Sequence, residues 1–171
     1  MTRCFTQGIN EIEKFIDFFE EDAENIRRVI EFVKDEGLDA EFILHGKAET
    51  VEESAENTGV EPRNVVKTLI FSGERPVAVL CPGNTSVAEE KLEEVLGSEV
   101  RMATPEEVTE ATGYTVGGVS PFDLEIPVYI EEEILERDEV KPAAGSRVLG
   151  LKVDPEALKE AVDAEAADIG R

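Results

Sequence analysis

A length of 171 residues with 41% hydrophobic residues suits one domain with its own core and argues against a disordered chain. Forty acidic residues against 17 basic ones give a formal net charge of −23, which argues against a nucleic-acid partner, because phosphate binding normally needs clustered Lys and Arg. Two cysteines far apart, Cys4 and Cys81, and a single histidine, His45, exclude a zinc ribbon and most His/Cys metal sites.

The acidic residues are spread over predicted helix faces rather than gathered in one tail. We interpret this charge as an adaptation to a salty cytoplasm, where a hydrated acidic surface keeps a protein soluble and salt shortens the repulsion. No stretch has the length of a transmembrane helix, and the N-terminal residues lack the apolar core of a signal peptide. We therefore expect a cytoplasmic protein with no membrane partner.

The N-terminal part of the chain predicts helices and one strand. Apolar residues at helical spacing predict two helices within about Asn10–Glu36, and Gly37 is a good helix C-cap. Weak alternation predicts a strand at Glu41–His45, and a capping box of Thr50 with Glu53 predicts a further short helix.

A β-hairpin is predicted in the middle of the chain. Two apolar runs, Asn64–Phe71 and Val77–Cys81, are joined by the polar link Ser72–Arg75, and Pro76 precedes the second run. A hairpin excludes a purely parallel sheet.

Beyond the hairpin, helices and strands alternate with short links. N-cap residues predict the helices, and short apolar runs predict the strands. The predicted helices begin at Ser86, Thr104-Pro105 and Asp154-Pro155, and the predicted strands are Val100–Ala103, Pro127–Glu131 and Arg147–Val153. We therefore predict an α/β fold of the mixed α+β kind, with a mixed β-sheet flanked by helices.

Lys67 is the most unusual residue of the first hairpin strand. Both faces of this strand are mostly apolar, which predicts a central, buried strand, and Lys67 falls within one apolar row. An ammonium group there is costly unless it reaches a partner or a cleft. The alternative is that Lys67 protects an edge strand from aggregation, but a strand that is apolar on both faces is seldom an edge. We therefore interpret Lys67 as part of a functional site.

A second candidate is the segment Ala111–Phe122, which carries no charge although 33% of the chain is charged. Gly117-Gly118 lets the backbone approach another group closely, and Pro121 stiffens the far side. Free backbone N–H groups in such a loop can hold an anion or a developing oxyanion. An ordinary glycine turn remains the alternative for this segment taken alone.

Classical nucleophilic machinery is missing from the sequence. A Ser-His-Asp or Cys-His arrangement would have to use His45, and no serine or cysteine lies in a recognisable elbow. If the protein is a hydrolase, the simplest mechanism therefore uses water, a fixed cation and backbone donors.

The order of these features resembles the YbaK/ProX-type aminoacyl-tRNA deacylases, the free-standing relatives of the editing domain of bacterial prolyl-tRNA synthetases. The resemblance spans about Ile26 to Ile169. Its carrying segments are Glu52–Phe71, Val77–Asn84, Thr112–Phe122 and the small-residue segment Lys141–Ser146. Lys67 matches the essential lysine of that family, and Gly117–Pro121, here called the glycine loop, matches its GxxxP loop.

The resemblance implies a mixed, partly barrel-like sheet and hydrolysis of the ester between a small mischarged amino acid and the 3′ ribose of tRNA, without a metal or an organic cofactor. In this mechanism Lys67 positions the substrate by its phosphate or carbonyl, and the glycine loop holds the oxyanion. The implied catalytic residues are Lys67, Gly117 and Gly118. The implied substrate-binding residues are His45, Arg63, Thr68, Val119, Ser120 and Pro121.

Two features depart from the family. Residues 1–25 are predicted to be an N-terminal helical extension, which leaves residues 26–171 as the editing domain. The acidity is unlike a typical tRNA binder, although residues 62–83 hold three basic side chains, Arg63, Lys67 and Arg75, against one acid, Glu74. A second hypothesis is a non-catalytic module of the same fold that binds a synthetase, tRNA or a nucleotide, because the acidic surface suits a protein partner better than RNA. A hydrolase that binds a metal through carboxylates is a third hypothesis.

Overall fold

The computed structural model describes residues 5–8, 21–44, 56 and 59–171. His45, the predicted capping box of Thr50 and Glu53 and the predicted helix around Ile12–Phe19 lie outside the described residues. Within the described ranges, no helix is long and apolar enough to cross a membrane.

Helices occur where the caps predict them, with one shifted start. The helices are α2 (Ala23–Glu36), α4 (Glu89–Leu96), α5 (Pro105–Thr112) and α6 (Pro155–Ala161), with short 3-10 helices η2 (Pro62–Asn64) and η3 (Glu132–Glu136). Gly37 ends α2 in the left-handed conformation at φ 64°, as predicted. Thr104 and Glu107 form a capping box at the predicted start of α5, and Asp154 caps α6 by accepting from the Ala157 N–H.

The predicted start of α4 at Ser86 is wrong. The helix begins at Glu89, and its N-cap Ala88 makes no side-chain cap. The chain stays extended before it, because Val87 pairs with Gly170 and the Ala88 N–H donates to the Ile169 carbonyl. Pairing with the C-terminal end of the chain therefore delays the helix by one turn.

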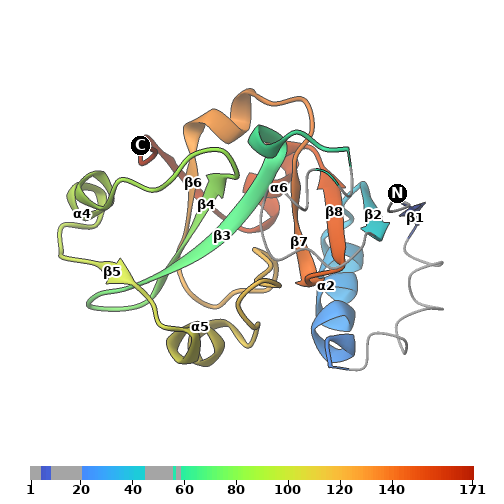
Figure 1. Cartoon of the computed structure of the whole chain (residues 1–171), viewed down its shortest axis with the longest axis horizontal. Helices are drawn as coiled ribbons and strands as arrows, with labels where there is room; N and C mark the ends of the chain where they lie inside the picture. The colour runs from blue at the N-terminus through green and yellow to red at the C-terminus, as the bar shows by residue number, and fades with distance from the viewer. Residues whose placement is uncertain (1–4, 9–20, 45–55, 57–58) are drawn as a thin grey trace.

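The strands form one mixed sheet, which confirms the predicted fold class (Figure 1). Their bounds are β1 (Phe5–Gln7), β2 (Ala40–Leu44), β3 (Val65–Ser72), β4 (Val77–Pro82), β5 (Arg101–Met102), β6 (Val128–Glu131), β7 (Lys141–Ser146), β8 (Leu149–Val153) and β9 (Glu165–Ala167). The order is β1-β2-β8-β7-β3-β4-β6-β9, and β5 pairs with β3. The pairs β3–β7, β4–β6 and β6–β9 are parallel and the others are antiparallel. Because β1 pairs with β2, part of residues 1–25 joins the sheet, and the division at residue 25 stays a prediction.

Strand β3 is central, as its two apolar faces predict, because a separate core covers each face. The large core contains Val66 and Ile70 of β3 and receives side chains from α2, α5 and α6. The small core contains Phe71 of β3 and Leu92 of α4. Since successive side chains point to opposite faces, Thr68 lies on the side of the large core and Lys67 on the side of the small core.

Candidate functional site

The glycine loop begins in a tight turn that requires glycine. The Gly118 N–H donates to the Thr115 carbonyl at 3.0 Å, and Gly117 has φ +99° at the third position of this turn. A turn of this kind needs a positive φ there, which glycine adopts without strain. A Cβ atom on Gly118 would lie 3.1 Å from the Cα of Ser146, so the loop lies directly against the link between β7 and β8.

Arg147, in that link, also holds the loop. Its guanidinium donates to the Val116 carbonyl at 3.1 Å, and its side chain occupies the space that a Cβ on Gly117 would need. The turn therefore requires glycine at position 117, and the loop packs closely on Ser146 and Arg147 at both Gly117 and Gly118.

Arg28 of α2 joins the two ends of the segment that contains the glycine loop. Its Nη1 donates to the Thr112 carbonyl at 2.6 Å, its Nε donates to the Asp123 carboxylate at 2.7 Å, and its Nη2 donates to the Asp123 carbonyl. The guanidinium also lies 4.3 Å from the ring centre of Tyr114. We call these contacts the Arg28 clamp. Because Thr112 and Asp123 flank the segment, the clamp fixes both ends of the segment.

Tyr114, which contacts Arg28, holds the loop from its buried side. Its hydroxyl donates to the Phe122 carbonyl at 2.8 Å, and burial raises the pKa of Tyr114 to about 12. Ser120 is fully buried, and its Oγ accepts from the Phe122 N–H at 3.4 Å. Pro121 is buried beside it. The loop is therefore a fixed structure, which is a condition for preorganised backbone donors.

Thr68 of β3 lies on the same side of the sheet as the glycine loop. Its neighbours in the row, Val66 and Ile70, belong to the large core, and Val119 of the loop packs against that core. The Thr68 hydroxyl oxygen is shielded from solvent and has no hydrogen-bond partner within the described part of the chain. An unpaired, buried hydroxyl is costly, so the Thr68 Oγ1 is a candidate for a hydrogen bond to a ligand.

Lys67 lies on the other side of β3. It is paired in register with Cys81, and its Nζ donates to the Thr85 carbonyl at 2.5 Å. Burial raises the pKa of the Cys81 thiol, while the hydrogen bond with Thr85 and the charge of Lys67 oppose that shift. The sheet thus separates the Lys67 amine from the side that carries Thr68 and Val119 of the glycine loop.

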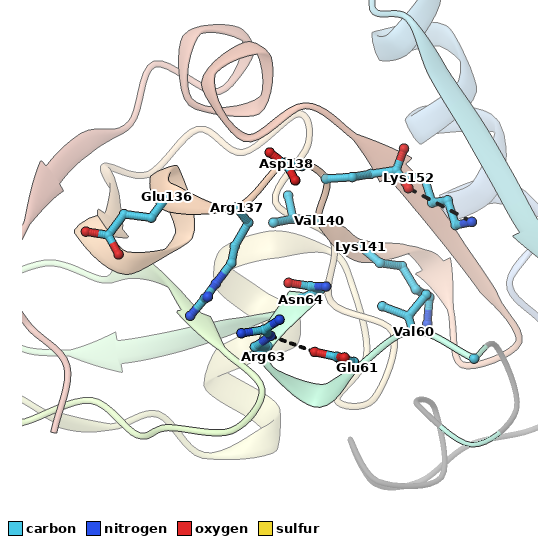
Figure 2. A pocket seen from close by; sticks show the side chains of 12 residues that line it. Val60, Glu61, Arg63, Asn64, Glu136, Arg137, Asp138, Val140, Lys141 and Lys152 are labelled. Carbon is cyan, nitrogen blue, oxygen red and sulfur yellow. Dashed lines mark hydrogen bonds and ion pairs between the residues drawn. The ribbon is translucent and has the colours of Figure 1, made fainter.

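A pocket of about 420 Å³ opens at the beginning of β3, where η2 leads into the strand (Figure 2). Arg63 and Asn64 line it, and Arg63 pairs with Glu61 at 2.6 Å. Arg137, Lys141 and Lys152 also line it. Of these cations, the family resemblance implied only Arg63 as a substrate-binding residue. Arg137 and Lys152 gave no signal, because only the pairing of β7 with β3 and β8 brings them to Arg63.

No group of three or more His, Cys, Asp or Glu side chains that could hold a metal ion occurs among residues 5–8, 21–44, 56 and 59–171.

The chain is similar to known editing proteins. The family model of the aminoacyl-tRNA editing domain matches residues 45–161. A candidate Cys-tRNA(Pro)/Cys-tRNA(Cys) deacylase, EbsC of Enterococcus faecalis, is 29% identical over 150 residues, which cover 85% of this chain and 92% of that protein.

Two further comparisons agree. A proline–tRNA ligase of Solidesulfovibrio magneticus is 39% identical over 119 residues, covering 67% of this chain and 21% of the ligase. The crystal structure of a candidate trans-editing enzyme for prolyl-tRNA synthetase superposes with a TM-score of 0.78 at 31% identity, covering 86% of this chain and 97% of that one. Because the family model spans well over half of the residues, the chain belongs to the aminoacyl-tRNA editing domain family.

Proposed function

We propose that this protein is a trans-editing deacylase, which hydrolyses the ester between a small mischarged amino acid and the 3′ ribose of a tRNA. The observation that carries this proposal is the family match over residues 45–161, because that range includes both β3 and the glycine loop. The match with EbsC supports an enzyme that acts as a separate protein rather than as part of a synthetase, because the match covers 92% of EbsC.

The reaction needs a nucleophile and a place for negative charge. Water adds to the ester carbonyl carbon, and the carbonyl oxygen becomes an oxyanion. When the carbonyl re-forms, the bond to the ribose oxygen breaks. One proton of the attacking water ends on the ribose oxygen, the other is released to solvent, and the amino acid leaves as a carboxylate. The protein accelerates this step by binding the oxyanion more strongly than the ester.

The glycine loop supplies the oxyanion donors in this proposal. Its amides are held by the tight turn and the Arg28 clamp, so they need little rearrangement when charge develops. The Gly118 N–H already donates to the Thr115 carbonyl, and we therefore assign the donor role to the neighbouring amides of Gly117 and Val119. Gly118 then contributes the close packing on Ser146 that sets the position of these amides.

Strand β3 positions the substrate from both of its sides. Thr68 offers an unpaired hydroxyl on the side of the glycine loop, which suits a hydrogen bond to the ester or to the ribose. Lys67 holds a phosphate of the tRNA at the end of the strand rather than the ester carbonyl, because its amine lies on the opposite side. When Lys67 binds a phosphate oxygen, its amine breaks its hydrogen bond to the Thr85 carbonyl.

A panel of mischarged tRNAs tests the proposal in ordinary and in high-salt buffer. We expect at least one substrate to be deacylated faster than in buffer alone. We expect Thr68→Val to lower kcat, and Lys67→Ala to raise KM with a smaller effect on kcat. Lys91→Ala is the matched control, because Lys91 lies on α4 in an exposed ion pair with Asp168. No turnover with any substrate, or full activity of Lys67→Ala, would contradict the proposal.

A second candidate is a non-catalytic module of the same fold that binds tRNA or a synthetase. The observation that favours it is the net charge of −23, which suits a protein partner better than RNA. The same panel separates the two functions. Turnover by the wild type, with a raised KM in Lys67→Ala while the variant unfolds at the wild-type temperature, excludes a non-catalytic module.

A further inference from the structure

We propose that the pocket at the beginning of β3 is an anion site that binds a backbone phosphate of the RNA strand whose 3′ end carries the amino acid. This inference rests on the proposed function, since it names a second contact for the same substrate. It also explains how an acidic protein holds a polyanion.

The pocket is a locally neutral place on a strongly acidic chain. Its charged lining residues are four cations, Arg63, Arg137, Lys141 and Lys152, and four acids, Glu61, Glu136, Asp138 and Glu139. The pocket therefore has a net charge of zero (4 − 4), whereas the chain carries −23. A phosphate group that approaches here meets less repulsion than over the acidic helix faces.

Arg137 is the side chain that points to a ligand. Its Nε is shielded from solvent and has no hydrogen-bond acceptor within the described residues. In Figure 2 its guanidinium points toward the same part of the pocket as that of Arg63, while the carboxylate of Glu136 is directed away. The Arg63 guanidinium is paired with the Glu61 carboxylate, so an anion held between the two guanidinium groups would share Arg63 with Glu61. A phosphate oxygen would satisfy the buried Nε with a charge-assisted, fork-shaped contact.

The pocket also lies at a suitable place along the strand. Asn64 lines the pocket, and Thr68 follows four residues later on β3, a span of about 13 Å at roughly 3.3 Å per residue. Lys141, which is buried in the pocket wall, is paired in register with Val65 at the same end of the strand. A single-stranded 3′ end can therefore place its terminal ester at Thr68 and an upstream phosphate in the pocket.

The experiment measures the affinity of the protein for a fluorophore-labelled acceptor-stem RNA that has a single-stranded 3′ end and carries no amino acid. Variants Arg137→Gln and Arg63→Gln each remove one charge from the pocket, and Lys91→Gln removes one charge from α4 as a matched control. We expect each pocket variant to weaken binding by about 3–10-fold and to lower the salt slope by about 1, while the control binds like the wild type. Thermal unfolding of each variant verifies its fold, and the exposed Arg63 provides the test if Arg137→Gln does not fold.

Competition identifies the source of the phosphate. AMP and inorganic phosphate should displace the RNA only at concentrations far above the RNA Kd, because each offers one of several contacts. Pocket variants that bind RNA like the control would overturn the inference, and so would displacement by AMP at the concentration of the RNA, which would make the pocket a site for free nucleotides.

The two proposals fail in different ways. If the wild type binds the RNA through Arg137 but deacylates no substrate, the proposed function fails and the anion site stands. If the wild type deacylates a substrate and Arg137→Gln leaves KM unchanged, the anion site fails and the enzyme stands.

Discussion

Removing Arg28 should destabilise the protein far more than removing other cations. The clamp provides two hydrogen bonds from a cation to main-chain carbonyls, at Thr112 and Asp123, each worth about 1.5–3 kcal/mol. The ion pair with the Asp123 carboxylate, which is 54% exposed, adds about 0.2–1 kcal/mol. The contact with the Tyr114 ring adds about 0.5–1 kcal/mol.

These contributions share one side chain and do not add fully. We therefore expect Arg28→Ala to lower the free energy of unfolding by about 2–4 kcal/mol, which for a chain of this size lowers Tm by roughly 4–16 °C. Arg28→Lys keeps the charge but loses the planar fork, so its loss should be about half as large.

Urea and thermal unfolding measure the loss, and amide hydrogen exchange locates it. Exchange should accelerate across the segment between Thr112 and Asp123 before it accelerates in β3 and β4. Lys91→Ala is the matched control, because its partner Asp168 is 68% exposed and the pair is worth about 0–1 kcal/mol. The reasoning is refuted if Arg28→Ala unfolds within about 0.5 kcal/mol of Lys91→Ala and the segment exchanges at the wild-type rate.

The remaining predictions concern the loop and one helix cap. Gly117→Ala should cost about 1–2 kcal/mol of strain at φ +99°, plus a clash with the Arg147 side chain, and should abolish deacylation. Gly37→Ala is the control in urea unfolding: at φ +64°, with nothing within 4 Å of the new Cβ, it should show the cost of the strain alone. Tyr114→Phe should cost about 1–3 kcal/mol, because the carbonyl that accepts its hydroxyl stays buried without a partner, and equal stability of the two proteins would contradict this. The hydrogen bond from Arg101 lowers the pKa of Glu107 from its usual 4.5 to about 2, so the carboxylate stabilises the fold above pH 4.5 and loses this effect as the pH falls toward 2. The unfolding free energy of Glu107→Gln should accordingly vary less with pH in that window.

Local signals predicted the elements that are stabilised locally. Helix α5 has its capping box, its first-turn proline and its terminal glycine within a few residues, and each functions as expected. The hairpin of β3 and β4 was equally readable, because both strands are apolar and are linked directly. The anomaly of Lys67 was visible for the same reason, since a cation in an apolar row stands out in one segment.

Elements and contacts that depend on pairing between residues far apart in the sequence could not be predicted from local patterns. The segment Lys141–Ser146 has no alternation of apolar residues and is a strand because β3 and β8 pair with it from both sides. A Cβ atom on its Gly145, at φ +90°, would lie 2.9 Å from the main chain of Asn25, a close approach that no local rule gives. The Arg28 clamp joins residues 95 positions apart, and in the sequence Arg28 is one more charge on a helix face. Only the fold shows that it fixes the glycine loop.

The net charge of −23 makes a final prediction about salt. An ordinary nucleic-acid-binding protein loses affinity steadily as salt rises, with a slope near −0.9 for each phosphate that it neutralises on duplex DNA and about −0.7 on a single strand. Here the few cations of the pocket act within a few ångströms, while the acidic surface repels the RNA over a Debye length of about 10 Å at 0.1 M salt. Added salt should therefore weaken the repulsion before it weakens the contacts. We expect the affinity for tRNA without an amino acid to be flat or rising from about 0.01 to 0.1 M salt, because the Debye length falls from roughly 30 to 10 Å over this range. Above this range the affinity should fall. A slope steeper than about −3 throughout would show that many phosphates are neutralised at once, which neither the pocket nor the acidic surface permits.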